Sequence, residues 1–184
     1  MCSLAELPDP AARLELEWLL GAWYVLFSNR SEWKVRRSHP RVEHQLLEPE
    51  PGERVRMLIT TRFRSPDLLG REKHRLAVAT AVAGPDEALG HFTAHGQGLA
   101  RVSSSRVSFA IVEPERRWAA VWHGRSSLGA AAGLDIYTRD PSIAQARLDL
   151  MLAELRAHPF LGTRCGGLFS ITHDWFPPER YRLG

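Results

Sequence analysis

The stretch Gly21-Ala22-Trp23-Tyr24-Val25-Leu26-Phe27 opens the first long run of strand-forming residues in the chain. Gly21 has no Cβ, so the backbone can turn sharply there and be approached closely. Trp23 brings the largest apolar surface available to a strand, and alternation places Trp23, Val25 and Phe27 on one face. We therefore expect that face to pack as one surface. Residues 9–20 before it predict a short helix, with Asp9 as its N-cap.

Seven further strand-like runs follow along the chain, at residues 41–47, 54–64, 73–82, 91–95, 106–112, 118–123 and 133–139. Turn-forming residues separate neighbouring runs, as in Pro49-Glu50-Pro51-Gly52. Short strands spaced by turns in this way favour a meandering antiparallel sheet. Eight such strands would close into an up-and-down barrel that holds one small ligand.

After the last barrel strand, residues 141–157 predict an amphipathic helix that packs outside the barrel. Residues 167–172 predict a closing strand. The fold class is therefore all-β, with one C-terminal helix beside an eight-stranded antiparallel barrel at about residues 21–139. We expect residues 1–184 to form a single domain.

The order of these motifs carries a family resemblance. Gly21-x-Trp23-Tyr24 comes first, in the first of eight strand-like runs, and Tyr137-x-Arg139-Asp140-Pro141 precedes the helix. This order resembles the lipocalins, within the calycin-like barrels, over roughly residues 15–175. The resemblance implies that Trp23 plugs the closed end of the barrel and that Arg139 covers it. The chain departs from the family at 112–115, where Val-Glu-Pro-Glu replaces a Thr-Asp-Tyr-like motif.

Bulk properties exclude several classes of partner. No run of about 18 apolar residues is present, so we expect no integral membrane association. The net charge is a modest +3, and the densest basic cluster (30–41) carries a single tryptophan ring, so nucleic acid is not favoured. Residues 1–6 lack a basic and then apolar leader, and we expect a cytoplasmic protein.

Two cysteines, Cys2 and Cys165, are too few for a disulfide framework. The lipocalin resemblance allows a Cys2–Cys165 bridge that ties down a terminal segment, whereas a reducing compartment favours idle thiols. The sequence does not decide between these two alternatives.

The basic connection at residues 28–40 has two interpretations. In lipocalins, the loop between the first two strands folds over the open mouth. Trp33 would then lie on the ligand, and the arginines would ring the entrance. Alternatively, the segment is a solvated basic loop with an exposed tryptophan.

Asp135 stands out among the residues of the last barrel strand. If Arg139 faces inward, alternation turns Asp135 and Tyr137 inward too. A carboxylate inside an apolar barrel must be paired or hydrogen-bonded. His123 on the preceding strand can supply that partner if Val121 also faces the cavity.

The facing of residues 118–123 has two alternatives. In the first, Trp118 and Trp122 lie outside, under the C-terminal helix; in the second, they line the cavity and His123 faces water. We favour the first, because the helix needs a large apolar surface on which to pack.

An Asp135–His123 pair could serve as a structural polar pair, as a hydrogen-bonding group for a polar ligand, or in proton transfer with His123 as general acid or base. His44 and His74 are further inward candidates. No His-x-His pair lies on a suitable element, so we expect neither a metal site nor a cofactor.

The sequence therefore predicts a carrier that binds one small, mostly hydrophobic molecule inside the barrel. The predicted lining consists of Phe27, Trp33, His44, Met57, Ile59, Thr61, Leu76, Val78, Phe109, Val121, His123, Asp135 and Tyr137. Arginines at the mouth indicate a ligand with an acidic end, such as a fatty or polyketide acid. The rival hypothesis is a barrel enzyme that isomerises or cyclises such a molecule, with His123 and Asp135 as its catalytic residues. The oligomeric state does not follow from the sequence.

Overall fold

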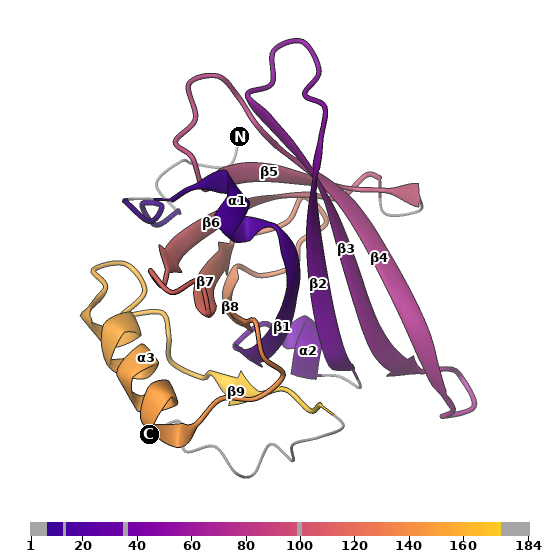
Figure 1. Ribbon diagram of the computed structural model, residues 1–184. Helices are drawn as coiled ribbons and strands as arrows, with labels where there is room; N and C mark the ends of the chain where they lie inside the picture. Colours follow the sequence, from indigo (N-terminus) through magenta and orange to yellow (C-terminus); the bar gives the residue numbers. More distant parts are fainter. Residues whose placement is uncertain (1–6, 13, 35–36, 99–100, 174–184) are drawn as a thin grey trace.

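The computed structural model describes residues 7–12, 14–34, 37–98 and 101–173. Within these residues, nine strands pair antiparallel in the order β2-β3-β4-β5-β6-β7-β8-β1-β9, and β1 also pairs with β2 (Figure 1). The second pairing of β1 closes the first eight strands into a barrel, as the sequence predicted. The strands are β1 Gly21–Ser28, β2 Ser38–Leu47, β3 Val55–Pro66, β4 Glu72–Ala83, β5 His91–Gly96, β6 Ser104–Val112, β7 Trp118–His123, β8 Gly133–Thr138 and β9 Phe169–Ser170.

The helices are shorter than the sequence predicted. The prediction of a helix at residues 9–20 is wrong except for one helical turn, α1 Leu16–Leu19. The segment before it bonds to the barrel instead, since the backbone N–H of Ala11 donates to the carbonyl of Phe109 at 3.0 Å. The C-terminal helix, α3 Gln145–Ala157, begins later than the predicted residue 141.

The connection between β1 and β2 forms regular structure that neither interpretation of the sequence predicted. It contains a short helix, α2 Ser31–Lys34, whose Trp33 is buried. The interpretation of an exposed tryptophan on a solvated loop is therefore wrong.

Two apolar cores lie on opposite sides of the barrel wall. The inner core includes Trp23, Phe109 and Val121, whereas the outer core packs α3 against the barrel through Trp118 and Trp122. The helix contributes four buried side chains to the outer core: Leu148, Met151, Leu152 and Leu155. The favoured facing of residues 118–123 is thus confirmed.

An irregularity in β1 overturns one prediction. Val25 pairs with Tyr137 on β8, but the next β8 residue, Ile136, pairs with Phe27, so Leu26 is skipped. This bulge moves Phe27 out of the alternating inward set and into the outer core beneath α3. Phe27 therefore does not line the cavity.

The facing of β4 is the reverse of the one predicted. Alanines face inward along this strand, with Ala79 opposite Ile59 and Ala81 opposite Met57. Leu76 consequently lies outside the barrel and is 61% exposed, and His74 is exposed as well. The larger apolar residues were expected inward, but the bulky side chains of β3 fill that side and leave room only for small partners.

The closed end of the barrel carries the contact that the family resemblance implied. The guanidinium carbon of Arg139 lies 3.5 Å from the centre of the Trp23 ring. Its nitrogens donate to the carbonyls of Trp18 at 2.7 Å and Ala22 at 2.9 Å. Burial lowers the pKa of Arg139 to about 10, which leaves it charged at neutral pH.

The barrel wall between β1 and β2 is paired over only part of its length. β1 pairs with β2 through Gly21 to Tyr24, and its far end pairs with β9 instead. The chain around β9 fills the gap: the N–H of Ile171 donates to the carbonyl of Leu26, and the N–H of His39 donates to the carbonyl of Thr172, each at 2.8 Å. The predicted closing strand at 167–172 is thus reduced to two strand residues with a bridging role.

The structure bears in part on two further expectations, those for the cysteines and for a membrane-spanning segment. Cys2 lies outside the described residues, so the two alternatives for the cysteines stay open; among the described residues Cys165 forms no disulfide. In the described part of the chain, no helix is long and apolar enough to cross a bilayer.

Candidate functional site

The barrel encloses a cavity of about 190 Å³. Nine of the predicted lining residues surround it: Trp33, His44, Ile59, Thr61, Phe109, Val121, His123, Asp135 and Tyr137. The other four do not. Phe27 and Leu76 lie outside the barrel, Met57 is buried in the inner core away from the cavity, and Val78 borders only a second chamber.

Two further hollows adjoin this cavity. A chamber of about 290 Å³ continues toward the open end and shares Arg30, Glu32 and Thr61 with it. A larger groove of about 970 Å³ lies beside α2 and β9, and shares Trp33 and Arg37 with the cavity. We place the site in the smallest of the three, because only that cavity is lined by Asp135 and His123.

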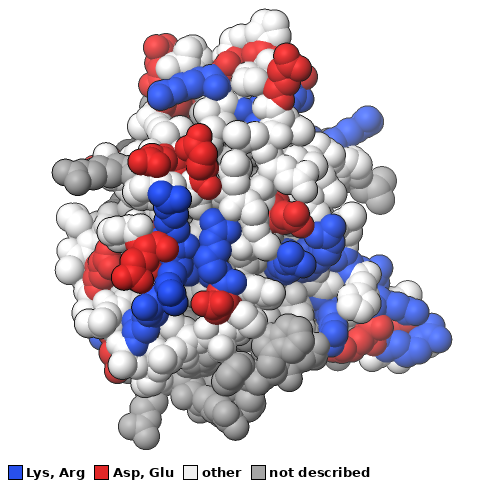
Figure 2. Space-filling view, viewed as in Figure 1, with Lys and Arg blue, Asp and Glu red and all other residues white. Residues whose placement is uncertain are grey.

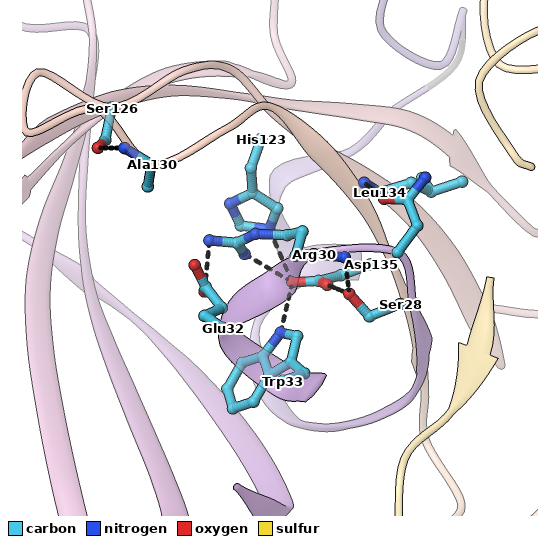
Figure 3. A network of polar contacts seen from close by, with 10 residues as sticks. Ser28, Arg30, Glu32, Trp33, His123, Ser126, Ala130, Leu134 and Asp135 are labelled. Atoms are coloured by element: carbon cyan, nitrogen blue, oxygen red, sulfur yellow. Dashed lines mark hydrogen bonds and ion pairs between the residues drawn. The ribbon is translucent and has the colours of Figure 1, made fainter. Parts of the chain in front are cut away.

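Asp135 is the centre of this buried cluster (Figure 3). One carboxylate oxygen accepts a hydrogen bond from Ser28 Oγ at 2.6 Å. The other accepts one from Arg30 at 2.8 Å and lies 3.2 Å from Nε2 of His123. The Trp33 indole N–H makes a longer contact with the same oxygen at 3.5 Å. The predicted Asp135–His123 pair therefore exists, but an arginine that the sequence did not point to shares the carboxylate.

Each charged group in the cluster lies beside a group of the opposite charge. Burial alone would raise the pKa of Asp135, but the charge of Arg30 and the contacts with His123 and Ser28 hold it below its ordinary value. Burial opposes the charge on Arg30, yet Asp135 and Glu32, at 2.5 Å from its second nitrogen, raise its pKa. Burial and the charge of Arg30 lower the pKa of His123 despite Asp135. At neutral pH the cluster thus contains two carboxylates, one guanidinium and a neutral imidazole.

Gly133 is the residue that lets Arg30 reach Asp135. A Cβ at position 133 would lie 2.5 Å from Cγ of Arg30 and 2.8 Å from Oδ1 of Asn29. That same oxygen accepts a hydrogen bond from the N–H of Leu134, which fixes the chain after β1 against β8. In the sequence, Gly133 close to the inward-facing Asp135 was the one available signal that another side chain could approach there. No local feature distinguished Arg30 from the neighbouring basic residues as that partner.

The floor of the cavity is aromatic, with two polar atoms. His44 is buried, and its Nδ1 lies 2.9 Å from the carbonyl of Leu19, which can only accept, so Nδ1 carries the proton. Burial lowers the pKa of His44 to about 4, so the neutral ring keeps a lone pair on Nε2. Burial and the charge of Asp135 raise the pKa of Tyr137, whose ring contacts those of His44 and Phe109. The floor therefore offers an acceptor and a hydroxyl within an apolar surround.

Comparison with known proteins bears on the fold alone. No family model matches the chain, and no curated protein sequence matches it. Several solved lipocalin structures match it over most of its length. Lobster apocrustacyanin A1 has a TM-score of 0.55 at 11% identity, over 86% of this chain and 79% of that one. The chain has the lipocalin fold.

Two other matches agree with this lipocalin architecture. The amine-binding protein of Rhodnius prolixus, solved with tryptamine, has a TM-score of 0.58 at 15% identity, over 89% of this chain and 84% of its own. The cockroach allergen Per a 4 has a TM-score of 0.57 at 11% identity, over 91% and 93%.

One cation at the mouth of the lipocalin barrel forms no ion pair with an acidic side chain of the described residues. Arg37 lies 4.9 Å over the ring of Phe63 and is exposed. Within the described residues it forms no ion pair, in contrast to Arg30. In the same part of the chain, no group of three or more His, Cys, Asp or Glu side chains could hold a metal ion. The site can thus enclose an apolar group, form hydrogen bonds with the ligand through His44 and Tyr137 at the floor, and attract an anion through Arg37 at the mouth.

Proposed function

We propose that this lipocalin-fold protein is a carrier for one compact, mostly apolar molecule that has an acidic group. The observation that carries the proposal is the barrel cavity, with aromatic residues at its floor and, at its opening, Arg37, which forms no ion pair with any described residue. The neutral His44 and Tyr137 favour an uncharged inner end. The acidic group then belongs at the outer end of the ligand.

The volume of the cavity limits the ligand. An apolar cavity of about 150 Å³ accommodates benzene in a protein core. The cavity here measures about 190 Å³, which suits one ring system with a short substituent. A long fatty chain would have to extend into the second chamber, so a small aromatic acid fits better than the fatty acids that the sequence suggested.

We infer the charge of the ligand from the arginine that is available to pair with it. Arg30 already faces Asp135 and Glu32, so it offers little attraction to another anion. Among the described residues, Arg37 has no such acidic neighbour. The Rhodnius protein is named for amines and was solved with tryptamine, whereas we infer the opposite charge for the ligand of this chain.

A matched pair of indoles tests this proposal. Indole-3-acetate and tryptamine have the same ring system and end in a carboxylate and an ammonium group, respectively. We expect calorimetry to show tighter binding of indole-3-acetate. Arg37→Gln should weaken that binding about fivefold, as for one exposed ion pair, and leave tryptamine unchanged. Tighter binding of tryptamine would refute the acidic group, and failure of both indoles would refute the small aromatic ligand.

A second pair of variants tests the location of the ligand. Ala79 lines the cavity, whereas Val82 on the same strand faces the other way, opposite Arg56. Ala79→Phe should fill the cavity and abolish binding of indole-3-acetate. Val82→Phe should leave the affinity within about twofold. Equal binding by both variants would place the ligand outside the barrel.

The contacts of Asp135 favour binding over the alternative of a proton-transferring enzyme. A carboxylate that orients a catalytic histidine must hold it in a defined hydrogen bond. Here Arg30 and Ser28 make the shorter contacts with Asp135, and the approach of His123 lacks hydrogen-bond geometry. The pair therefore acts in our proposal as part of the cavity wall.

A further inference from the structure

The end of the β3–β4 hairpin projects far beyond the neighbouring strand. β4 pairs with β5 only from Ala79 to Val82, whereas it pairs with β3 down to Glu72. The seven residues of β4 that β5 does not pair, Glu72 to Val78, correspond to about 23 Å of strand. We call residues 62–76 the arm; it extends toward the lower right in Figure 1.

The tip of the arm exposes two leucines in an ordered turn. Leu68 is fully exposed and Leu69 is 76% exposed. The Asp67 carboxylate accepts hydrogen bonds from the N–H groups of Leu69 at 2.9 Å and Arg71 at 3.0 Å. Gly70 has a φ of +77°, which permits the tight reversal. The turn therefore holds both apolar side chains in the solvent.

Positive charge surrounds these leucines. The arm contains five Lys and Arg residues (Arg62, Arg64, Arg71, Lys73 and Arg75) against Asp67 and Glu72. Lys73 and Arg75 form no ion pair within the part of the chain that the structure describes. Figure 2 shows the basic side chains gathered over the arm at the lower right.

Protection of an open strand edge explains only half of this pattern. β4 has no β5 partner below Ala79, and charged side chains on such an edge discourage pairing with other chains. Edge protection does not account for adjacent leucines at the most exposed point, where apolar side chains promote association. Apolar tips ringed by cations are instead the pattern that binds the interface of an anionic bilayer.

We propose that the arm docks this protein on anionic lipid membranes, with Leu68 and Leu69 inserted among the lipids and Lys73 and Arg75 against the headgroups. Because the β3–β4 turn lies at the open end of the barrel, docking would turn the mouth toward the bilayer. The β5–β6 and β7–β8 loops, at the same end, each expose one aliphatic side chain as well, Val102 and Leu128. The proposal stands on the arm and is independent of what the cavity binds.

Co-sedimentation with vesicles tests the docking. We expect the protein to bind vesicles of phosphatidylcholine with 30% phosphatidylglycerol at least tenfold more tightly than phosphatidylcholine alone, with a loss of binding at 0.5 M NaCl. The double variant Leu68→Ser/Leu69→Ser should reduce binding to the anionic vesicles at least tenfold. Lys73→Gln/Arg75→Gln should reduce it about tenfold at low salt.

The matched control is Leu150→Ser, which removes a leucine that is 73% exposed on α3 and far from the arm in sequence. This control should bind as the unaltered protein does. Circular dichroism and thermal melts would show that all variants are folded. Failure to bind anionic vesicles, equal loss in the control, or a dimer that the leucine variants dissociate would overturn the proposal, the last by assigning the arm to a second copy of the chain.

Discussion

Asp135 must stay ionised inside the barrel, and its contacts make its removal costly. Replacing it by Asn leaves the buried guanidinium of Arg30 with Glu32 as its one acidic contact in the described chain. Breaking one side of a buried ion pair costs about 3–5 kcal/mol. We therefore expect Asp135→Asn to reduce the free energy of unfolding in urea by that amount.

A surface pair provides the comparison for this experiment. Glu43 pairs with Arg62 at 3.0 Å, but Arg62 is 55% exposed, so Glu43→Gln should cost less than about 1 kcal/mol. The double variant Arg30→Gln/Asp135→Asn should lose less than the sum of its single changes, because the two groups are coupled. Simple additivity would show that the cluster is not a unit.

The lowered pKa of His44 predicts that the free energy of unfolding decreases as the solution becomes acidic. Its pKa is about 4 in the folded chain, below the ordinary value of 6.5. Between these two values the unfolded chain binds a proton that the folded chain refuses, so stability decreases as the pH falls. Between pH 7 and pH 5 this difference amounts to about 2 kcal/mol.

Urea unfolding at the two pH values measures this loss. His44→Phe keeps an aromatic ring at the floor and should reduce the pH dependence by about 2 kcal/mol, whatever its own stability. His74→Gln removes an exposed imidazole on the outside of the barrel and should retain the full dependence. An unchanged slope in His44→Phe would contradict the assignment.

At the scale of the elements, α2 divides the cavity from the surface groove. Trp33 borders both hollows and contacts Phe63 edge-on, with 6.0 Å between ring centres. Trp33→Ala should open a second exit and speed dissociation of indole-3-acetate about tenfold in stopped-flow displacement. Lys34→Ala changes an exposed side chain of the same helix and should leave the rate unaltered. Equal rates would mean that the ligand leaves through the other chamber.

The strands themselves were readable from the sequence, but their facing was not always. Alternation in residues 54–64 is strict, and β3 faces as predicted, with Ile59 and Thr61 on the cavity. Two local events defeated the same rule elsewhere. The bulge at Leu26 has no signature in composition, and β4 turns alanines inward because the bulky side chains of β3 leave room there only for small partners.

At the scale of the whole molecule, the barrel was predictable because motifs far apart in the sequence mark its first and last strands. Gly21-x-Trp23 and Arg139 lie at opposite ends of the barrel sequence, and their contact defines how the ends of the sheet meet. The buried cluster was only half predictable. Alternation brought Asp135 and His123 together on adjacent strands, whereas Arg30 comes from the loop after β1, where no periodicity indicates direction.

The bridging of β1 and β2 by the segment around β9 has a consequence for biosynthesis. Residues 169–173 follow every other described element, so they are synthesised after all of them. A nascent chain that has completed only α3 therefore leaves part of β1 without a partner, and unpaired strand backbone can recruit neighbouring chains. The barrel wall between β1 and β2 is completed only after residues 169–173 have been translated.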